Sequence, residues 1–168
     1  MKPFSVMFQE QHSNVIEYNG KIINSFFKFE QRGEFIFKFK FVSTNSEHKQ
    51  EIRLACDQFD GSVEFRGKEI EFGKSRFKQV AFCETIENKQ FEIKVVLKDG
   101  SLGIFNASEP GGSWVRGCAM IIEKKCQNKY RFYCNDFEND DDFDDLIFDL
   151  EILEFSDSNT GDGTMCSS

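Results

Sequence analysis

Apolar residues that alternate with polar ones constrain the fold of this chain more than any other feature of its sequence. In the clearest run, every second residue from Phe35 to Phe41 is a phenylalanine. Similar alternation recurs over 91–97 and 146–152. Successive side chains of a β-strand point to opposite faces, so each run has one face suited to a hydrophobic core. Because phenylalanine supplies 21 of the aromatic residues, we expect a core built mainly from phenyl rings.

Turn-forming dipeptides separate these runs. Asn19-Gly20, Asp60-Gly61 and Asp99-Gly100 favour the positive φ angles of tight hairpins. Arg66-Gly67 marks a further turn, and no window shows a convincing helical stripe. The pattern therefore predicts strands over 4–8, 14–18, 22–30, 34–42, 50–56, 62–66, 69–73, 77–86, 90–97, 102–106, 113–123, 129–134 and 145–155.

These strands recur about every ten residues, a spacing that favours a sandwich or a barrel. The predicted fold class is all-β, an antiparallel β-sandwich of jelly-roll type. One domain is expected over residues 1–155, a length that can bury a core without staples. Residues 156–168 are polar and rich in Ser and Gly, which predicts a disordered tail.

Charge is distributed unevenly along the chain. The net charge is −8, yet all 21 basic residues lie at or before Arg131. Residues 135–168 contain 12 acidic residues and no basic one. This balance gives no electrostatic footprint for nucleic acid, whereas the acidic end would attract cations or a basic partner. The same asymmetry allows copies of the chain to pair head to tail as a homo-oligomer.

Cysteine usage and apolar runs bear on the compartment. The longest apolar run, Cys118–Ile122, is far shorter than the roughly 20 residues of a membrane span. The first ten residues contain no continuous apolar stretch, so we expect no secretory signal and no membrane span. The six cysteines are therefore expected to be free thiols. The chain is predicted to be cytoplasmic, or exported without a classical signal peptide.

Residues 135–145 place seven carboxylates in eleven positions. Carboxylates held close together repel one another, and a hard divalent cation compensates for that repulsion. Calcium takes six to eight oxygen ligands, which clustered Asp and backbone carbonyls can supply. An EF-hand is excluded because Asp145 stands where its loop requires glycine. The candidate metal ligands are Asp136, Glu138, Asp140, Asp142, Asp144 and Asp145.

The order of residues from Asp140 to Phe148 resembles a signature of calcium-associated β-sandwich modules in bacterial surface and exported proteins. Their C-terminal ends commonly read Asp-x-Asp-(Phe/Tyr)-Asn-Asp, followed by hydrophobic residues and Phe. The resemblance covers about twenty residues. It implies that the acids precede the final strand and hold calcium through Asp140, Asp142, Asp144 and Asp145.

A second candidate site is the glycine-rich segment 109–117, which contains the only tryptophan. Trp114 could stack on a sugar ring while Arg116 takes its hydroxyl groups. The alternative is a simple turn followed by a strand whose Trp114 belongs to the core. The segment has neither the P-loop Lys-Ser/Thr pair nor the dinucleotide glycine spacing.

These observations favour binding over catalysis. Both histidines lie outside strong strands, and no nucleophile elbow occurs, so no catalytic residue is assigned and no enzyme is expected. The first hypothesis is a calcium-dependent binding module, lectin-like or adhesive, with a carbohydrate or protein ligand. The alternative is a cytosolic interaction or structural module whose acidic loop binds a basic partner. A hydrolase would instead need two inward carboxylates in a cleft.

Overall fold

The computed structural model describes residues 2–71, 79–85, 89–108, 118–136 and 140–155, with the backbone alone at 56–58, 70 and 71. Trp114, Arg116, Glu138 and the predicted tail over 156–168 lie outside these residues. The described elements are α1 (Phe4–Glu10), β1 (Val15–Tyr18), β2 (Lys21–Asn24), β3 (Phe27–Phe29), β4 (Gly33–Thr44), β5 (Gln50–Phe65), β6 (Lys68–Glu71), β7 (Gln79–Cys83), β8 (Gln90–Ser108), β9 (Ala119–Cys126), β10 (Lys129–Asn135) and β11 (Leu146–Glu154).

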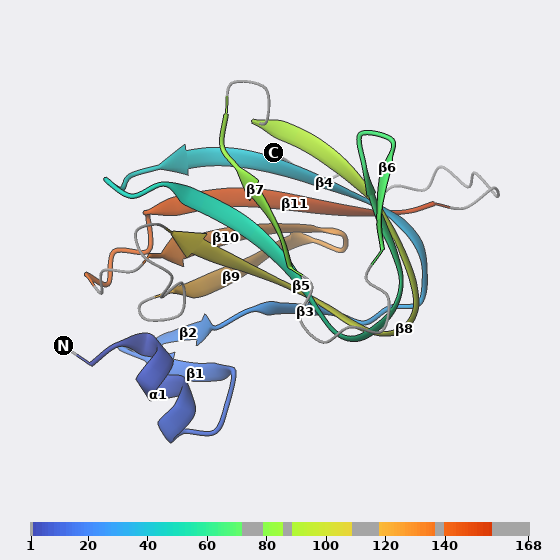
Figure 1. Cartoon of the computed structure of the whole chain (residues 1–168). Helices are drawn as coiled ribbons and strands as arrows, with labels where there is room; N and C mark the ends of the chain where they lie inside the picture. The colour runs from blue at the N-terminus through green and yellow to red at the C-terminus, as the bar shows by residue number, and fades with distance from the viewer. Residues whose placement is uncertain (1, 72–78, 86–88, 109–117, 137–139, 156–168) are drawn as a thin grey trace.

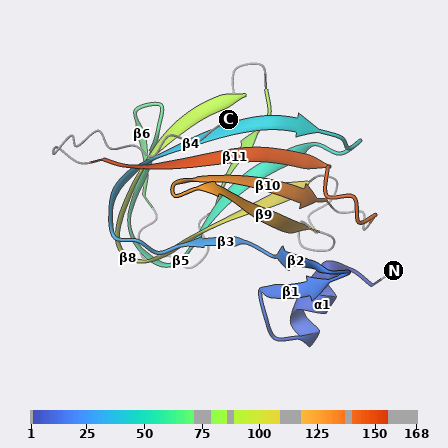
Figure 2. The same ribbon diagram turned by 180° about the vertical axis from the view of Figure 1, so that it is seen from behind.

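All the described strands belong to one curled antiparallel sheet (Figures 1 and 2). Its main path runs β1-β2-β9-β10-β11-β4-β8-β5-β6, while β3 pairs with β8 and β7 pairs with β5. The prediction of an all-β antiparallel fold is therefore confirmed. Hydrogen bonding joins the strands into one continuous sheet, and the finer jelly-roll sandwich topology stays a prediction. Among the described residues, no helix has the length and apolar character that a membrane crossing requires.

The two longest strands, β5 and β8, allow the sheet to curl. Strand β8 pairs with β4 through 90–97 and with β3 through 102–104, on either side of a bend. The predicted hairpins at Asp60-Gly61 and Asp99-Gly100 are wrong, because each strand continues through its Asp-Gly pair. Asp60 and Asp99 are register partners, and the register shifts beside Gly61. Each Asp-Gly pair thus bends a strand, as a β-bulge does, and does not reverse the chain.

Two other predicted turns are confirmed. Asn19 and Gly20 join β1 to β2 with φ angles of 49° and 76°. Arg66 and Gly67 join β5 to β6 with φ angles of 52° and 75°. Two consecutive positive φ angles are typical of the type I′ turn, whose twist matches that of the flanking strands.

The predicted strand over 4–8 is a helix. Phe4 and Phe8 are one helical turn apart, and both are buried. Helix α1 packs with the β1–β2 hairpin around a small second core, to which Ile16, Ile23 and Phe143 also contribute. Apolar residues at 4, 6 and 8 fit the period of a strand, whereas those at 4, 7 and 8 fit the period of a helix, so a run this short does not distinguish the two. Figures 1 and 2 show α1, β1 and β2 together at one end of the molecule.

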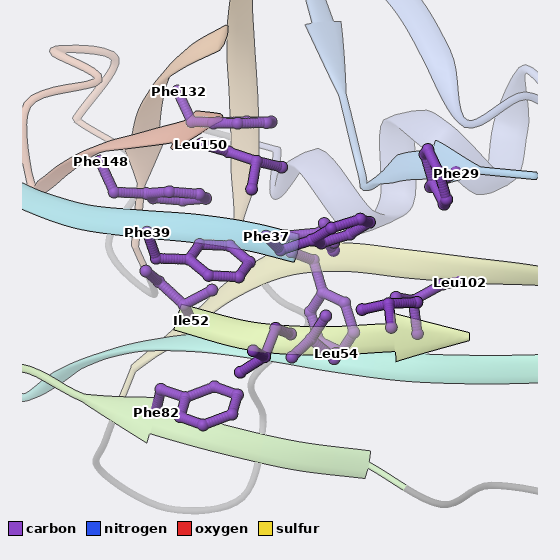
Figure 3. Close-up of a cluster of buried hydrophobic side chains, with 14 of the residues drawn as sticks. Phe29, Phe37, Phe39, Ile52, Leu54, Phe82, Leu102, Phe132, Phe148 and Leu150 are labelled. Atoms are coloured by element: carbon purple, nitrogen blue, oxygen red, sulfur yellow. The ribbon is translucent and has the colours of Figure 1, made fainter. Parts of the chain in front are cut away.

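Phenyl rings form the main core, as predicted (Figure 3). Every phenylalanine from Phe35 to Phe41 in β4 is buried. The alternate residues Phe91, Ile93, Val95 and Leu97 of β8 are buried as well. Phe29 of β3 contacts Phe35 and Phe37 of β4 edge to face, each at 5.0 Å between ring centroids. Strand β3 pairs with β8 and has no backbone pairing with β4 in the described sheet, so these contacts close the core across the curl.

Gly61 is required at the bend of β5. A Cβ at this position would lie 1.8 Å from the carbonyl oxygen of Val96. We predict that Gly61→Ala lowers the free energy of unfolding by at least about 3 kcal/mol, because the paired backbone must move apart. Gly67, in the exposed turn between β5 and β6, also has a positive φ angle. A Cβ at this position would meet no atom within 4 Å. Gly67→Ala should therefore cost only about 1–2 kcal/mol. Urea denaturation measures both, and equal losses would contradict the role of the close approach.

Candidate metal centre

Buried polar residues gather at one end of the curled sheet. The start of β5 faces the end of β8, with Gln50 opposite Ser108, and the end of β10 lies beside them. Asn106 donates from Nδ2 to the carbonyl oxygen of Asn135 at 2.8 Å. The buried polar or charged residues of the described chain are Gln50, Glu51, Asn106, Ser108, Asn135, Asp136 and Asp145. The apolar core thus ends in a polar cap at this edge.

Asp136 and Asp145 tie the two sides of the acidic segment together. The backbone N–H of Asp136 donates to Oδ2 of Asp145 at 2.8 Å. Oδ2 of Asp136 accepts hydrogen bonds from the Ser46 hydroxyl and, at 3.1 Å, from Nε2 of Gln50. Both aspartates are buried, with exposed fractions of 2% and 3%. These bonds fix the carboxylate of Asp145 where β11 is about to begin.

Three carboxylates converge at this place. Asp140, Asp142 and Asp145 each offer an oxygen, and these oxygens lie within 4.8 Å of one another. Two oxygens bound to one calcium ion at about 2.3–2.6 Å cannot lie more than about 5 Å apart, so the observed separation fits a shared ion. No Lys or Arg in the described part of the chain forms an ion pair with these three residues. Within the described residues, no ion pair therefore offsets the charge of these three carboxylates when they are ionised.

Two side chains of the loop before β11 contact the N-terminal elements. Asp141 and Phe143 both adopt positive φ, at 65° and 55°. The hydroxyl of Tyr18 donates to Oδ2 of Asp141 at 2.7 Å. Phe143 is buried in the second core, 5.6 Å from the ring of Phe4. The loop thus contributes carboxylates to the cluster, and through Asp141 and Phe143 it also contacts β1 and α1.

Asp144 is not one of the converging three, although its side chain also interacts with that of Asp142. Its Oδ2 accepts a hydrogen bond from Nδ2 of Asn45 at 2.9 Å, and its backbone N–H lies 3.4 Å from Oδ1 of Asp142. Of the six ligands expected from the sequence, the structure brings together Asp140, Asp142 and Asp145. It places Asp136 behind Asp145 and Asp144 against Asn45, and Glu138 lies outside the described residues.

The environment of the cluster disfavours its ionised form. Burial, followed by the charges of Asp136, Asp140 and Asp142, raises the pKa of Asp145 to about 7. Loss of hydration also raises the pKa of Asp142 to about 6. A divalent cation would reverse this effect, because it stabilises ionised carboxylates. The arrangement can therefore exchange protons for a metal ion near neutral pH.

Sequence reasoning missed the residues that support the loop from elsewhere. Tyr18 is 123 positions from Asp141, and Asn45 is 99 positions from Asp144. No spacing or motif connects residues so far apart. Only the pairing of β4 with β11, which places Thr44 opposite Leu146, brings Asn45 to the loop.

The cysteines do not build a second metal site in the described residues. Cys83, Cys118 and Cys134 are free thiols, as expected, and burial raises the pKa of Cys118 to about 12. Cys126, in contrast, is disulfide-bonded, so the expectation that every cysteine is free is wrong for this residue. Cys118, Cys126 and Cys134 do not form a group of metal ligands among the described residues.

Comparison with known proteins adds no further assignment. No protein-family model matches the chain, and no curated protein matches its sequence.

The raised pKa values predict an unusual pH dependence for the metal-free protein. An aspartate whose pKa is higher in the folded state stabilises the fold when protonated, and that contribution is lost as pH rises through the folded-state value. We expect the free energy of unfolding in chelator to fall between pH 5 and pH 8, in the range set by pKa values of about 6 and about 7. Urea denaturation at several pH values measures this.

Asp145→Asn provides the matched test, because its amide oxygen can still accept the Asp136 N–H. The variant should flatten the pH dependence. Asp99→Asn, at an exposed carboxylate of β8 paired with Arg32, should leave the dependence unchanged. A slope in Asp145→Asn equal to that of the unmodified protein would show that Asp145 is not the source.

Proposed function

We propose that this protein is a calcium-dependent binding module of lectin-like or adhesive type, in which the ion orders the loop before β11. The observation that carries the proposal is the convergence of Asp140, Asp142 and Asp145 at one edge of the sheet, with their oxygens within 4.8 Å. The short resemblance to calcium-associated β-sandwich modules implies these three residues together with Asp144, at the same place before the final strand.

The chemistry of the donors favours calcium over softer metals. All three side chains are carboxylates, whereas zinc sites are built mainly from Cys and His. Asp140, Asp142 and Asp145 would hold the ion, and backbone carbonyls or water would complete its shell of six to eight oxygens. Asp136 would act indirectly, since its N–H fixes one oxygen of Asp145. The ion would supply charge neutralisation and rigidity.

An ion at this place would also affect the N-terminal elements. The bond from Tyr18 to Asp141 and the packing of Phe143 on Phe4 connect the loop to β1 and α1. A loop whose carboxylates repel one another holds these contacts less well than a loop closed on an ion. Calcium would therefore stabilise the docking of α1 and the β1–β2 hairpin against the main sheet.

The alternative from the sequence uses the same loop without a metal. Asp140 and Asp142 are exposed, so a basic partner protein could contact them directly. Such a contact weakens steadily with ionic strength, whereas a calcium site responds to chelator far more than to modest salt. The two functions are therefore separable by experiment.

Calcium titration of the chelator-treated protein tests the proposal. A ligand that binds only the native state stabilises it by RT ln(1 + [L]/Kd), so the melting temperature should rise with calcium concentration. At 100 times Kd the expected gain is about 2.7 kcal/mol. The double variant Asp140→Asn/Asp142→Asn should remove this rise, because two of the three converging carboxylates lose their charge.

Glu34→Gln/Glu64→Gln is the matched control, since both residues are exposed strand positions and the change in net charge is the same. The control should keep the full calcium response. If the unmodified protein shows no shift at millimolar calcium, the proposal fails, and the acidic protein-binding surface becomes the better interpretation. Pull-downs at varied salt would then follow.

Hydrogen exchange tests the coupling to the N-terminal elements. Calcium should slow amide exchange in α1, β1 and β2 of the unmodified protein. Tyr18→Phe removes the hydroxyl that donates to Asp141 but keeps the ring that packs on Phe4 at 5.1 Å. The calcium effect on exchange should therefore shrink in Tyr18→Phe while remaining in Tyr133→Phe, since Tyr133 also packs against the second core but its hydroxyl donates to Glu123 of β9. Identical effects in the two variants would exclude this coupling.

A further inference from the structure

Strand β7 lies at an edge of the curled sheet, beside the first half of β5 (Figure 1). Its five residues, Gln79–Cys83, pair with residues 51–55 of β5. On its other side, no described strand forms a backbone pairing with β7. An edge strand has unpaired N–H and C=O groups that can bond to a further strand. Strand β7 therefore offers a place where one more strand can join the sheet.

The other edge strands of the described sheet are protected against such pairing. At the start of β1, the Ser13 hydroxyl donates to the carbonyl oxygen of Val15 and accepts from its N–H, so both groups are already bonded. Strand β6 contains Lys68 and Glu69, and β3 contains Lys28 at its centre. Charged side chains on an edge oppose strand addition, because pairing removes them from water. Among the described edge strands, β7 alone has no charged residue.

The side chains on the outer face of β7 leave its free edge accessible. Oε1 of Gln79 accepts a hydrogen bond from Arg53 of β5 at 3.4 Å. The Cys83 thiol donates to Oε1 of Glu51, also in β5, at 3.6 Å. These two side chains thus lean toward β5 and away from the free edge. Between them lies the exposed Ala81, whose side chain is only a methyl group.

The sequence of β7 is complementary to itself in an antiparallel register centred on Ala81. Gln79 then lies opposite Cys83 of the second copy, and the two Ala81 methyl groups meet at the two-fold axis without crowding. Val80 lies opposite Phe82, and a β-branched residue beside an aromatic ring is a favourable cross-strand pair. Both already pack in or against the main core, so this pairing extends that core across the interface.

We infer that two copies of this chain associate through β7, antiparallel about Ala81, so that one sheet continues across the dimer. Contact between identical edges is closed by its two-fold axis, which limits the assembly to two copies. Five residues on each side form a small interface, so the dimer is weak and accumulates only at high protein concentration. The contact uses no residue of the acidic cluster and is independent of the proposed function.

Sedimentation equilibrium of the full chain in chelator tests the inference, over protein concentrations from about 10 μM to about 500 μM. The unmodified chain should pass from monomer to dimer within this range. Ala81→Lys should weaken dimerisation by about tenfold or more, because two like charges meet at the axis. Ser43→Lys adds the same charge at an exposed position of β4 and should leave dimerisation unchanged. An unmodified chain that stays monomeric throughout would overturn the inference.

Ala81→Glu distinguishes a failed fold from a broken dimer. Its carboxylate would face Arg53, the register partner of Ala81 in β5, so the monomer should fold. Alone, this variant should also dimerise about tenfold more weakly than the unmodified chain. Mixed in equal amounts, Ala81→Glu and Ala81→Lys should form a heterodimer, because opposite charges then meet at the axis. Full dimerisation of Ala81→Glu alone would reject the register, and if Ala81→Lys does not fold, this measurement decides.

Salt distinguishes the β7 contact from head-to-tail pairing of acidic and basic segments. Because β7 has no charged residue, dimerisation of the unmodified chain should change little between about 50 mM and about 500 mM salt. Head-to-tail pairing would weaken steadily over the same range. A dimer that dissociates in salt and persists in Ala81→Lys would place the contact elsewhere and reject β7 as the interface.

Discussion

Stacking of phenyl rings across neighbouring strands is the interaction on which the rest of this structure depends. Phe132 and Phe148 stack at 4.5 Å between centroids, with their planes 9° apart. Phe148 lies 6.3 Å from Phe39, which stacks on Phe91 at 5.1 Å, and Phe91 stacks on Phe82 at 4.7 Å. This series crosses β10, β11, β4, β8 and β7, so it links strands that are far apart in the chain. Offset ring pairs stabilise beyond the area they bury, and they fix the strand register.

The same register creates the polar end of the sheet. Because β11 enters the core at Leu146 and Phe148, the acidic residues just before it must stop at the edge. There they meet Asn45 and Gln50, which flank the connection from β4 to β5. Core packing therefore concentrates the carboxylates without any attraction between them. A cation would offset the resulting repulsion.

Much of the sheet could be predicted from alternation alone, because a buried face imposes a period of two on each strand. The buried phenylalanines from Phe35 to Phe41 and the set of 91–97 show this. The helix over Phe4–Glu10 could not be predicted, since seven residues fit either period. The Asp-Gly pairs could not be assigned from the sequence either, because glycine with a positive φ angle occurs both in β-bulges and in hairpin turns.

Local sequence patterns are sufficient to predict the all-β class, the faces of the main strands and the candidate ligands among the acids of 135–145. These properties follow from local periodicity and composition, which act over a few residues. Folding of distant segments against one another sets the convergence of Asp140, Asp142 and Asp145 and the bond from Asn45 to Asp144. It alone brings Tyr18 to Asp141. These outcomes depend on strand order and long-range register, which are set by packing between distant segments.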